Sequence, residues 1–446
     1  MVAARRRILL LAAAPVRLQR RRGGAGRGRA GRRRLGGFLV PPRRARRQLS
    51  ANRLFIRNLG PDPRRRRNLL PGVAQANLAP AHNGPNATGG QRQVSDQENA
   101  VRLDAGELED FSTALFVACG VPAKDAGLTA RSLVWADLRG IYSHGVVRLQ
   151  PGYLKALQSG ANNPRPEISV LLDGPAFAVF DGDRGMGQVA AERAVQTAMG
   201  KARESGIGLT CVRNSRHFGA AAYWPYLAAE EQMIGFSSSN GGVVNTAPYG
   251  GARSVMGNNP HAWVIPAGND RPVILDMATG VAAMGKVMMA RLHDQPLPEG
   301  WCMDSDGNDT TDPHAAVSML PAGGAKGYAI GYVLDLISGA LAGALTSPVK
   351  SLGGISGDEA DQTGMTFLVI DIAAVTDAAD FAATAEQTAA IVRQTPPRPG
   401  FDRVYVPGEI EWNTYDDRIV NGIPASQAEI SVLAQMASEQ GIESIC

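Results

Sequence analysis

The distribution of charge along the chain constrains its folding more than any other feature of the sequence. Residues 1–100 contain 23 arginines, no lysine and three acidic residues, a net charge of +20. The rest of the chain carries 23 basic and 38 acidic side chains, a net charge of −15. So many like charges with so little apolar surface cannot bury enough to offset the conformational entropy lost on folding. We therefore expect an acidic folded body, residues 101–446, after a disordered Arg-rich tail, residues 1–100.

The tail admits other interpretations. It is Arg-rich and acid-poor like an organelle transit peptide, and an apolar run at 8–16 follows three arginines as in a secretory signal. It could neutralise nucleic-acid phosphates, which makes a nucleic-acid-binding protein the alternative of another class. No aromatic residues are interleaved for base stacking, so nucleic acid is not the expected partner. The absence of lysine would also fit a segment that lies upstream of the true start codon and is included because the start was misplaced. We expect a disordered or artefactual tail and a cytoplasmic protein.

Several kinds of site find no support in the sequence. The four cysteines are far apart and form no C-x-x-C pair, which fits a reducing compartment. The six histidines show neither H-x-x-x-H nor H-E-x-x-H spacing, so no metal site is expected. No G-x-S-x-G motif of a serine hydrolase occurs.

The body combines strand and helix patterns. Asp104, followed by Glu107, predicts the cap of a first helix, and apolar residues from 126 to 138 predict a second that ends at Gly140. From 168 onward strands and helices alternate, which predicts a mixed α/β domain. The last 70 residues are mostly helical. The apolar run 327–345 contains four glycines and Asp335, so we interpret it as a buried core helix rather than a membrane span.

Three loops carry possible chemistry. The stretch "FDGDRGMGQVA" (180–190) contains G-x-G-x-x-A, but Asp181 and Asp183 would repel a pyrophosphate, so a tight turn is expected there. "RNSRHFGAAAYW" (213–224) places His217 before small residues that could open a helix toward a phosphate or cofactor. "GGAKGY" (323–328) sets Lys326 beside backbone N–H groups that could face a phosphate.

The stretch "DLRGIYSHGVVRL" (137–149) brings together Ser143, His144 and Arg148. If the segment is helical, the spacing of four puts His144 and Arg148 on one face. An imidazole can exchange a proton near neutral pH, and a guanidinium can hold a carboxylate with two parallel hydrogen bonds. We expect this stretch to handle a proton and a carboxylate.

These stretches, taken in order, resemble the type II malate/L-lactate dehydrogenase family. The matching segments are "DLRGIYSHGVVRL", "RHFGAAAYW", "APYGG", "GNNP", "VILDMATG", "GGAKGYAI" and "VPGE", between about residues 103 and 412. The resemblance implies an α/β fold, in which a non-Rossmann mixed-sheet nicotinamide-binding domain (168–375) lies beside a mostly helical domain built from both ends of the body (101–167 with 376–446). It also implies a homodimer with the active site near the subunit interface.

The resemblance assigns roles by position. His144 would exchange the proton with help from Ser143, and in some members the histidine at His217 is the base. Arg148 would bind the substrate carboxylate, and Asn258 matches a substrate-side threonine. The positions matching cofactor-binding segments are His217, Phe218, Gly219, Ala220, Ala221, Asn240, Asp276, Met277, Ala278, Lys326, Gly327, Pro407, Gly408 and Glu409.

Three departures from the family pattern leave the identity of the substrate open. Met284 stands where the family has an arginine, and Tyr153 comes one residue later than the family tyrosine. Lys286 stands where reductases of cyclic imino acids have an acid, which disfavours that branch. We expect an oxidoreductase that transfers a hydride between NAD or NADP and a small 2-hydroxy or 2-oxo acid, with an NAD(P)H-dependent reductase of cyclic imino acids as the alternative.

Overall fold

A computed structural model of the chain describes residues 101–241, 243–352 and 363–445, and the expected Arg-rich tail lies outside these residues. In chain order the helices and helical turns are α2 (Ala105–Ala118), α3 (Ala123–Leu138), η2 (Tyr142–His144), η3 (Val146–Arg148), η4 (Leu149–Leu154), α4 (Lys155–Gln158), α5 (Gly187–Ser205), α6 (Tyr223–Glu230), α7 (Met284–Leu292), α8 (Ala325–Asp335), η5 (Leu336–Leu341), α9 (Ser347–Lys350), α10 (Ile372–Val375), α11 (Ala378–Arg393), α12 (Glu409–Asn421) and α13 (Gln427–Gln440). The strands are β1 (Val101–Leu103), β2 (Ser169–Asp173), β3 (Phe177–Asp181), β4 (Ile207–Ser215), β5 (Met233–Ser239), β6 (Val244–Thr246), β7 (Met256–Gly257), β8 (His261–Ala267), β9 (Asp270–Met277), β10 (Cys302–Met303), β11 (Asp309–Thr310), β12 (Ser318–Met319), β13 (Thr363–Asp371) and β14 (Ile423–Ala425).

The central feature of the described residues is a mixed sheet with the strand order β2-β3-β4-β13-β5-β8-β9. Strand β3 runs parallel to β4 through the crossover helix α5, and the other neighbours in this sheet run antiparallel. Such a sheet differs from the open, mostly parallel sheet of the doubly wound dinucleotide-binding fold. The expected mixed-sheet α/β fold is therefore confirmed.

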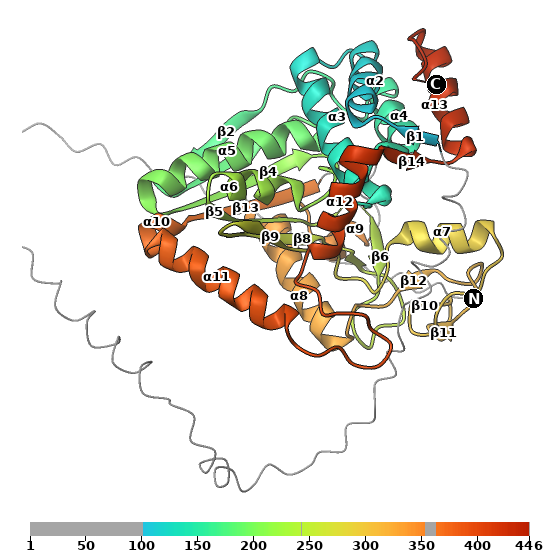
Figure 1. Cartoon of the computed structure of the whole chain (residues 1–446). Helices are drawn as coiled ribbons and strands as arrows, with labels where there is room; N and C mark the ends of the chain where they lie inside the picture. Colours follow the sequence, from blue (N-terminus) through green and yellow to red (C-terminus); the bar gives the residue numbers. More distant parts are fainter. Residues whose placement is uncertain (1–100, 242, 353–362, 446) are drawn as a thin grey trace, which may run out of the picture. The chain divides into compact units, whose positions relative to one another are not determined.

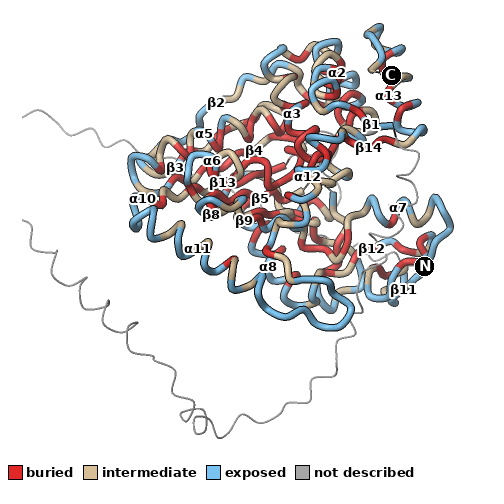
Figure 2. The backbone as a smooth tube through the Cα atoms, in the orientation of Figure 1, coloured by how far each residue is buried: buried red, intermediate tan, exposed pale blue. Residues whose placement is uncertain are grey.

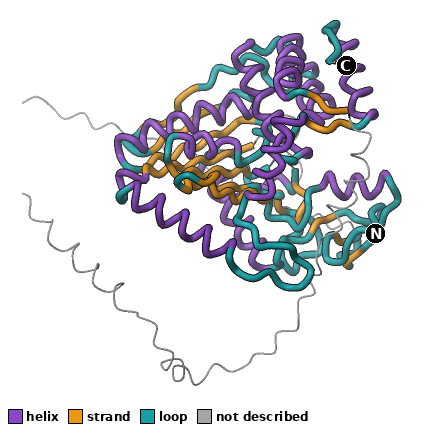
Figure 3. Tube along the Cα trace, viewed as in Figure 1, coloured by secondary structure: helices purple, strands orange, loops and turns teal. Residues whose placement is uncertain are grey.

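Helices cover both faces of this sheet (Figures 1 and 3). On one face α5 lies so close to β4 that a Cβ on Gly208 would sit 1.9 Å from the carbonyl oxygen of Ala198. On the opposite face η5 approaches β13, where a Cβ on Gly364 would sit 1.8 Å from the carbonyl oxygen of Ser338. Buried residues accordingly concentrate along the strands and the inner sides of these helices (Figure 2).

The two ends of the described body meet. Strand β1 pairs antiparallel with β14, with Leu103 opposite Ile423. Apolar residues of α2, α3 and η4 form one hydrophobic core with residues of β14 and α13, and a second core lies between the sheet and α5. This arrangement agrees with a helical domain built from both chain ends, although the exact division into domains stays a prediction.

Local expectations about the first helix and the glycine-rich turn agree with the structure. The Asp104 carboxylate caps α2 by accepting from the backbone N–H groups of Gly106 and Glu107. In the turn between β3 and α5, Asp181 accepts hydrogen bonds from Arg213, Asn214 and the N–H of Asp183. The Asp181 carboxylate thus holds the turn together through hydrogen bonds, as expected of a tight turn.

The apolar run 327–345 differs from its expected form. Helix α8 and the π-helical turn η5 bury a narrow stripe of mostly small residues against the sheet, and expose Ile330, Val333, Leu336 and Leu341. The interpretation as a buried core helix is right for one face only, because Leu334 and the small residues pack inward while most of the other large apolar side chains are exposed. In the part of the chain that the structure describes, no helix combines the length and apolar character needed to cross a membrane.

Candidate active site

The segment after α3 consists of two single 3-10 turns rather than an α-helix. Turn η2 carries His144 and turn η3 carries Arg148, and Gly145 between them is extended, with φ −88° and ψ −157°. The assumption of one α-helical face for His144 and Arg148 was therefore wrong. The two side chains are nevertheless electrostatic neighbours, because the Arg148 charge contributes to the low pKa of His144.

The two expected histidines meet. The imidazole rings of His144 and His217 stack with their centroids 5.5 Å apart and an interplanar angle of 24°. Ser143 Oγ lies 2.9 Å from His144 Nδ1. Sequence reasoning placed these residues in one site although 72 residues separate the two rings in the chain.

A chain of hydrogen bonds holds His217 from behind. Gln188 Nε2 donates to the Tyr153 hydroxyl over 2.8 Å, and that hydroxyl lies 2.6 Å from His217 Nδ1. The backbone N–H of Gly219 also points to Nδ1, over 3.4 Å. With Nδ1 accepting from both groups, the proton of the neutral ring sits on Nε2.

The environment keeps both imidazoles neutral. Burial and the charge of Arg148 lower the pKa of His144 to about 4. Burial, followed by the charges of His144 and Arg148, lowers the pKa of His217 well below its ordinary value. Burial raises the pKa of Tyr153 to about 12, so its hydroxyl stays protonated and can donate to His217. A bound carboxylate on Arg148 would oppose that arginine's effect on both rings.

Arg148 is suited to bind an anion beside these rings. Its side chain is exposed, whereas Tyr153 is buried and His217 is half-buried. Its positive charge acts on His144, Tyr153 and His217, because it contributes to lowering the pKa of all three groups. The segment thus carries an imidazole and an exposed guanidinium that influence each other electrostatically.

Two features missed by sequence reasoning complete this part of the site. Gln188 lies in the glycine-rich segment considered only as a phosphate loop or turn, and Gly187 before it lets α5 begin against the chain at His217. A Cβ on Gly187 would sit 2.2 Å from the carbonyl oxygen of Arg216. The π-helical turn η4 carries Tyr153, and the one-residue offset of this tyrosine was the signal that could have predicted an unusual turn.

The segment 217–222 joins the end of β9. Phe218 is a buried core residue stacked on Trp224, and it anchors the small residues that follow. The N–H of Ala222 donates to the Asp276 carboxylate over 3.3 Å. Two expected cofactor segments, His217–Ala221 and Asp276–Ala278, therefore lie side by side.

From Asp276 the chain leads to the other expected segments. Asn258 Oδ1 accepts from the N–H of Gly280 over 2.6 Å, which fixes the predicted substrate-side residue beside the β9 loop. The N–H of Ala322 donates to the carbonyl of Thr279, shortly before Lys326 and Gly327 at the start of α8. A small cavity of about 10 Å³ lies there, lined by residues that include Thr246, Met256, Thr279, Gly327, Tyr328 and Gly331.

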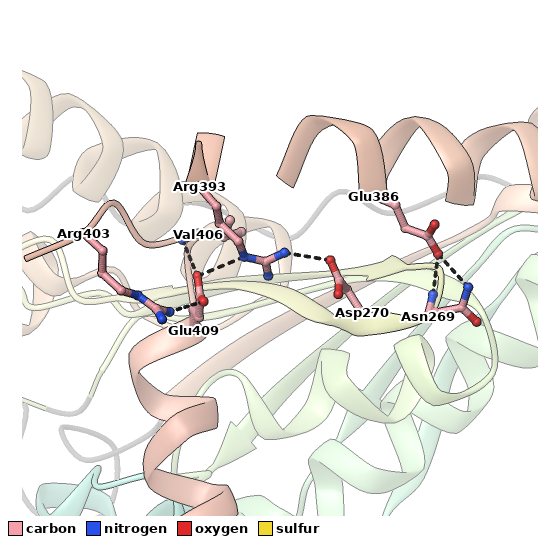
Figure 4. A network of polar contacts seen from close by, with 7 residues as sticks. All are labelled: Asn269, Asp270, Glu386, Arg393, Arg403, Val406 and Glu409. Atoms are coloured by element: carbon pink, nitrogen blue, oxygen red, sulfur yellow. Dashed lines mark hydrogen bonds and ion pairs between the residues drawn. The ribbon is translucent and has the colours of Figure 1, made fainter. Parts of the chain in front are cut away.

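The P-G-E segment also reaches β9, because the N–H of Ile274 donates to the Pro407 carbonyl over 3.0 Å. Gly408 has φ +88°, and a Cβ there would lie 2.8 Å from the Ile274 side chain. The Glu409 carboxylate accepts from Val406 N–H and pairs with Arg393 and Arg403 (Figure 4). Although burial alone would raise it, these contacts lower the pKa of Glu409. The Glu409 carboxylate thus connects the loop that carries Arg403 and Val406 to α11, and does not point into open space.

Asn240 is likewise committed to the fold. Its side chain is fully buried, donates to the Leu345 carbonyl over 2.6 Å and accepts from the N–H of Gly364 over 2.9 Å. These bonds tie the end of β5 to β13. Its backbone is paired as well, because the N–H donates to the Gly364 carbonyl and the carbonyl accepts from the Ser347 hydroxyl.

The residues present fit a dinucleotide. Gly219 is left-handed, with φ +81°, and the residues that follow it up to Ala222 are small and buried, so this segment itself carries no bulky side chain that would block a ligand at its backbone. Gly327 and Gly331 line the small cavity next to Lys326. Among the described residues no group of three or more metal-ligating side chains gathers.

Comparison with known proteins identifies the family. A family model described as malate/L-lactate dehydrogenase matches residues 103–434. The chain belongs to the malate/L-lactate dehydrogenase family. The resemblance inferred from the motifs is confirmed, and the protein is an oxidoreductase related to hydroxyacid dehydrogenases.

Individual relatives cover nearly the whole body. A malate dehydrogenase of Pyrococcus horikoshii is 36% identical over 359 residues, which are 78% of this chain and 98% of the relative. An L-sulfolactate dehydrogenase of Methanocaldococcus jannaschii is 38% identical over 316 residues, 70% of this chain and 88% of the relative. The chain also resembles the solved structure of a delta1-piperideine-2-carboxylate reductase from Pseudomonas syringae, with a TM-score of 0.68 and 28% identity. The match covers 76% of this chain and 100% of that one.

Proposed function

We propose that this enzyme of the malate/L-lactate dehydrogenase family transfers a hydride between NAD or NADP and carbon 2 of a small 2-hydroxy or 2-oxo acid. The observation that supports this proposal is the stacked pair His144 and His217 beside the exposed Arg148. A neutral imidazole exchanges the proton of the substrate oxygen, and a guanidinium holds the carboxylate attached to the reacting carbon. The similarity to malate and sulfolactate dehydrogenases agrees with a substrate of this class.

His217 is the proton carrier in this proposal. In the reduction direction the Nε2 proton passes to the carbonyl oxygen of the 2-oxo acid as carbon 2 receives the hydride, while Nδ1 takes the Tyr153 hydroxyl proton, so that the ring stays neutral and the tyrosine regains a proton from water. The nicotinamide ring supplies that hydride when bound. The Tyr153 hydroxyl, which already donates to Nδ1, can return a proton to the ring. His144, held by Ser143, lines the other side of the substrate.

Reduction of cyclic imino acids remains the second candidate, favoured by the similarity to the piperideine-2-carboxylate reductase. Its substrate also has a carboxylate beside the reacting carbon, so Arg148 would serve both reactions. Lys286, which stands where that branch has an acid, favours the 2-oxo acid.

The test is a nicotinamide absorbance screen at 340 nm with NADH and NADPH against malate-type, lactate-type and sulfo-substituted 2-oxo acids and piperideine-2-carboxylate. We expect turnover with a 2-oxo acid. The proposal fails if imines alone are reduced, or if neither class is reduced with either cofactor.

A homodimer is part of the same proposal. The exposed apolar face of α8 and η5 (Ile330, Val333, Leu336 and Leu341, defined above) is the kind of surface that a second copy of the chain covers. Arg148 and Met277 are exposed in one chain, which suits an active site near such an interface. A cytoplasmic location also stays a proposal.

A further inference from the structure

The carboxylate of Asp137 lies directly beneath the segment that carries the site. Asp137 is the second-last residue of α3 and its side chain is 2% exposed. Its Oδ2 accepts a hydrogen bond from the backbone N–H of Val146 over 2.8 Å. Val146 stands midway between His144 and Arg148, so this bond links α3 to the centre of the segment.

The same carboxylate also requires the glycine next to His144. A Cβ on Gly145 would lie 1.8 Å from Asp137 Oδ1 and 2.2 Å from its Cγ. Real Cβ atoms do not approach that closely, so no other residue fits at 145 unless the carboxylate or the segment moves. The backbone is therefore held by attraction at Val146 and by close contact at Gly145.

We propose that Asp137 is a positioning residue whose buried carboxylate holds Gly145 and Val146, and thereby sets the distance between His144 and Arg148. The inference deepens the proposed function and rests on it where catalysis is concerned. Asp137 touches neither reacting group. It acts through the backbone between them, which is where a shift of about 1 Å would misplace both side chains relative to one substrate.

The charges that face Asp137 come from two neighbouring elements. Arg418 of α12 donates to the Asp137 carbonyl and to the Tyr142 hydroxyl, and its positive charge favours the ionised carboxylate. Glu429 of α13 opposes ionisation. A cavity of about 200 Å³ with largely apolar walls, including Leu108, Ile423 and Leu433, adjoins the carboxyl group.

Ionisation of this group lies in the physiological range. Burial raises the pKa of Asp137 to about 7, against the favourable effects of the Val146 N–H and Arg418. Above this pH the charged carboxylate makes a strong hydrogen bond to Val146, and below it the neutral acid makes a weaker one. Binding of the substrate carboxylate should therefore weaken as the pH falls through about 7, well above the pKa of about 4 for His144.

The experiment compares Asp137→Asn and Asp137→Ala with the matched control Asp125→Asn, which makes the same change at the other end of α3. Asp137→Ala should lower kcat/KM for the oxo acid at least tenfold, and leave the Kd of NADH or NADPH within twofold. Asp137→Asn keeps the shape and can keep a neutral hydrogen bond. Between pH 6 and 8, kcat/KM of Asp137→Asn should equal that of the wild type at pH 6, and its pH profile should lack the inflection near 7.

A direct readout needs no activity. Hydrogen exchange measured on the Val146 amide should show a protection factor at least tenfold lower in Asp137→Ala than in Asp125→Asn. Gly145→Ala should be strongly impaired alone, whereas in the Asp137→Ala background it should cost little, because the atoms it would strike are gone.

The outcomes separate this inference from the proposed function. Unchanged protection of Val146, an inflection near pH 7 that persists in Asp137→Asn, or equal costs of Gly145→Ala in both backgrounds would each overturn the role of Asp137. If the wild type reduces no oxo acid, the proposed function fails while the hydrogen exchange of Val146 still decides whether Asp137 holds the segment. If Asp137→Ala does not fold, the pH profile of Asp137→Asn decides.

Discussion

At the scale of single residues, the two stacked imidazoles differ in what supports them. His217 is backed by the buried Tyr153 and Gln188, whereas His144 contacts the exposed Ser143. We expect His217→Asn to lower kcat by about 10²- to 10⁴-fold, the usual contribution of a proton-transferring group. His144→Asn should mainly raise KM. Steady-state kinetics with saturating cofactor check this, and a larger loss of kcat in His144→Asn would reverse the assignment.

Arg148 gives a second prediction at this scale. Its positive charge contributes to the low pKa of both histidines, so Arg148→Gln should raise the pKa of His144 and of His217. Titration of the imidazole resonances by NMR in the free enzyme measures the shift. Because oxidation requires a neutral imidazole, the acid limb of the oxidation rate should move to higher pH in this variant. A pKa that stays the same or falls would show that Arg148 does not lie where we place it.

At the scale of elements, the π-helical turn η4 carries Tyr153. A π-helical turn holds one more residue than an α-helical turn, and the family resemblance implies a tyrosine one residue earlier in the chain. We infer that the turn Leu149–Leu154 accommodates one extra residue, so that the Tyr153 hydroxyl still reaches His217.

Deletion of Gln150 tests this explanation. The shortened turn should become α-helical and keep the tyrosine against His217, so kcat should remain within about threefold of the wild type. Tyr153→Phe, which removes only the hydroxyl, should lower kcat about 10- to 100-fold because the tautomer of His217 is no longer held. Equal losses in the two variants would mean that the π-helical turn does more than accommodate the extra residue.

At the scale of the whole molecule, the exposed face of α8 and η5 predicts assembly. Leu336→Asp should convert a dimer to a monomer, because a carboxylate in an apolar interface loses its hydration without gaining a partner. Val375→Asp places the same change on the exposed short helix α10 and should leave the dimer intact. Light scattering after size-exclusion chromatography measures the mass. A monomeric wild type, or a dimer unaffected by Leu336→Asp, would exclude this face as the interface.

The sequence by itself determined the elements and the chemical groups. Caps, glycines and apolar periodicity act over a few residues, so α2, α3, α5 and the central-sheet strands β2, β3, β4, β5 and β13 could be predicted from local patterns. The order of the motifs was enough to indicate the family and the chemistry of His144, His217 and Arg148. Local signals also mark where an element ends: β13 ends at Asp371, whose side chain caps the short helix α10.

Only the tertiary structure decided which of these groups meet. The contact of Tyr153 with His217 joins residues 64 apart, and that of Arg418 with the Asp137 carbonyl joins residues 281 apart. No local pattern contains such pairs, because they depend on how the two chain ends pack and on the extra residue in η4. The same holds for the exposed face of α8. Sequence periodicity locates its apolar residues, but the packing of small residues against the sheet decides which side of the helix is buried.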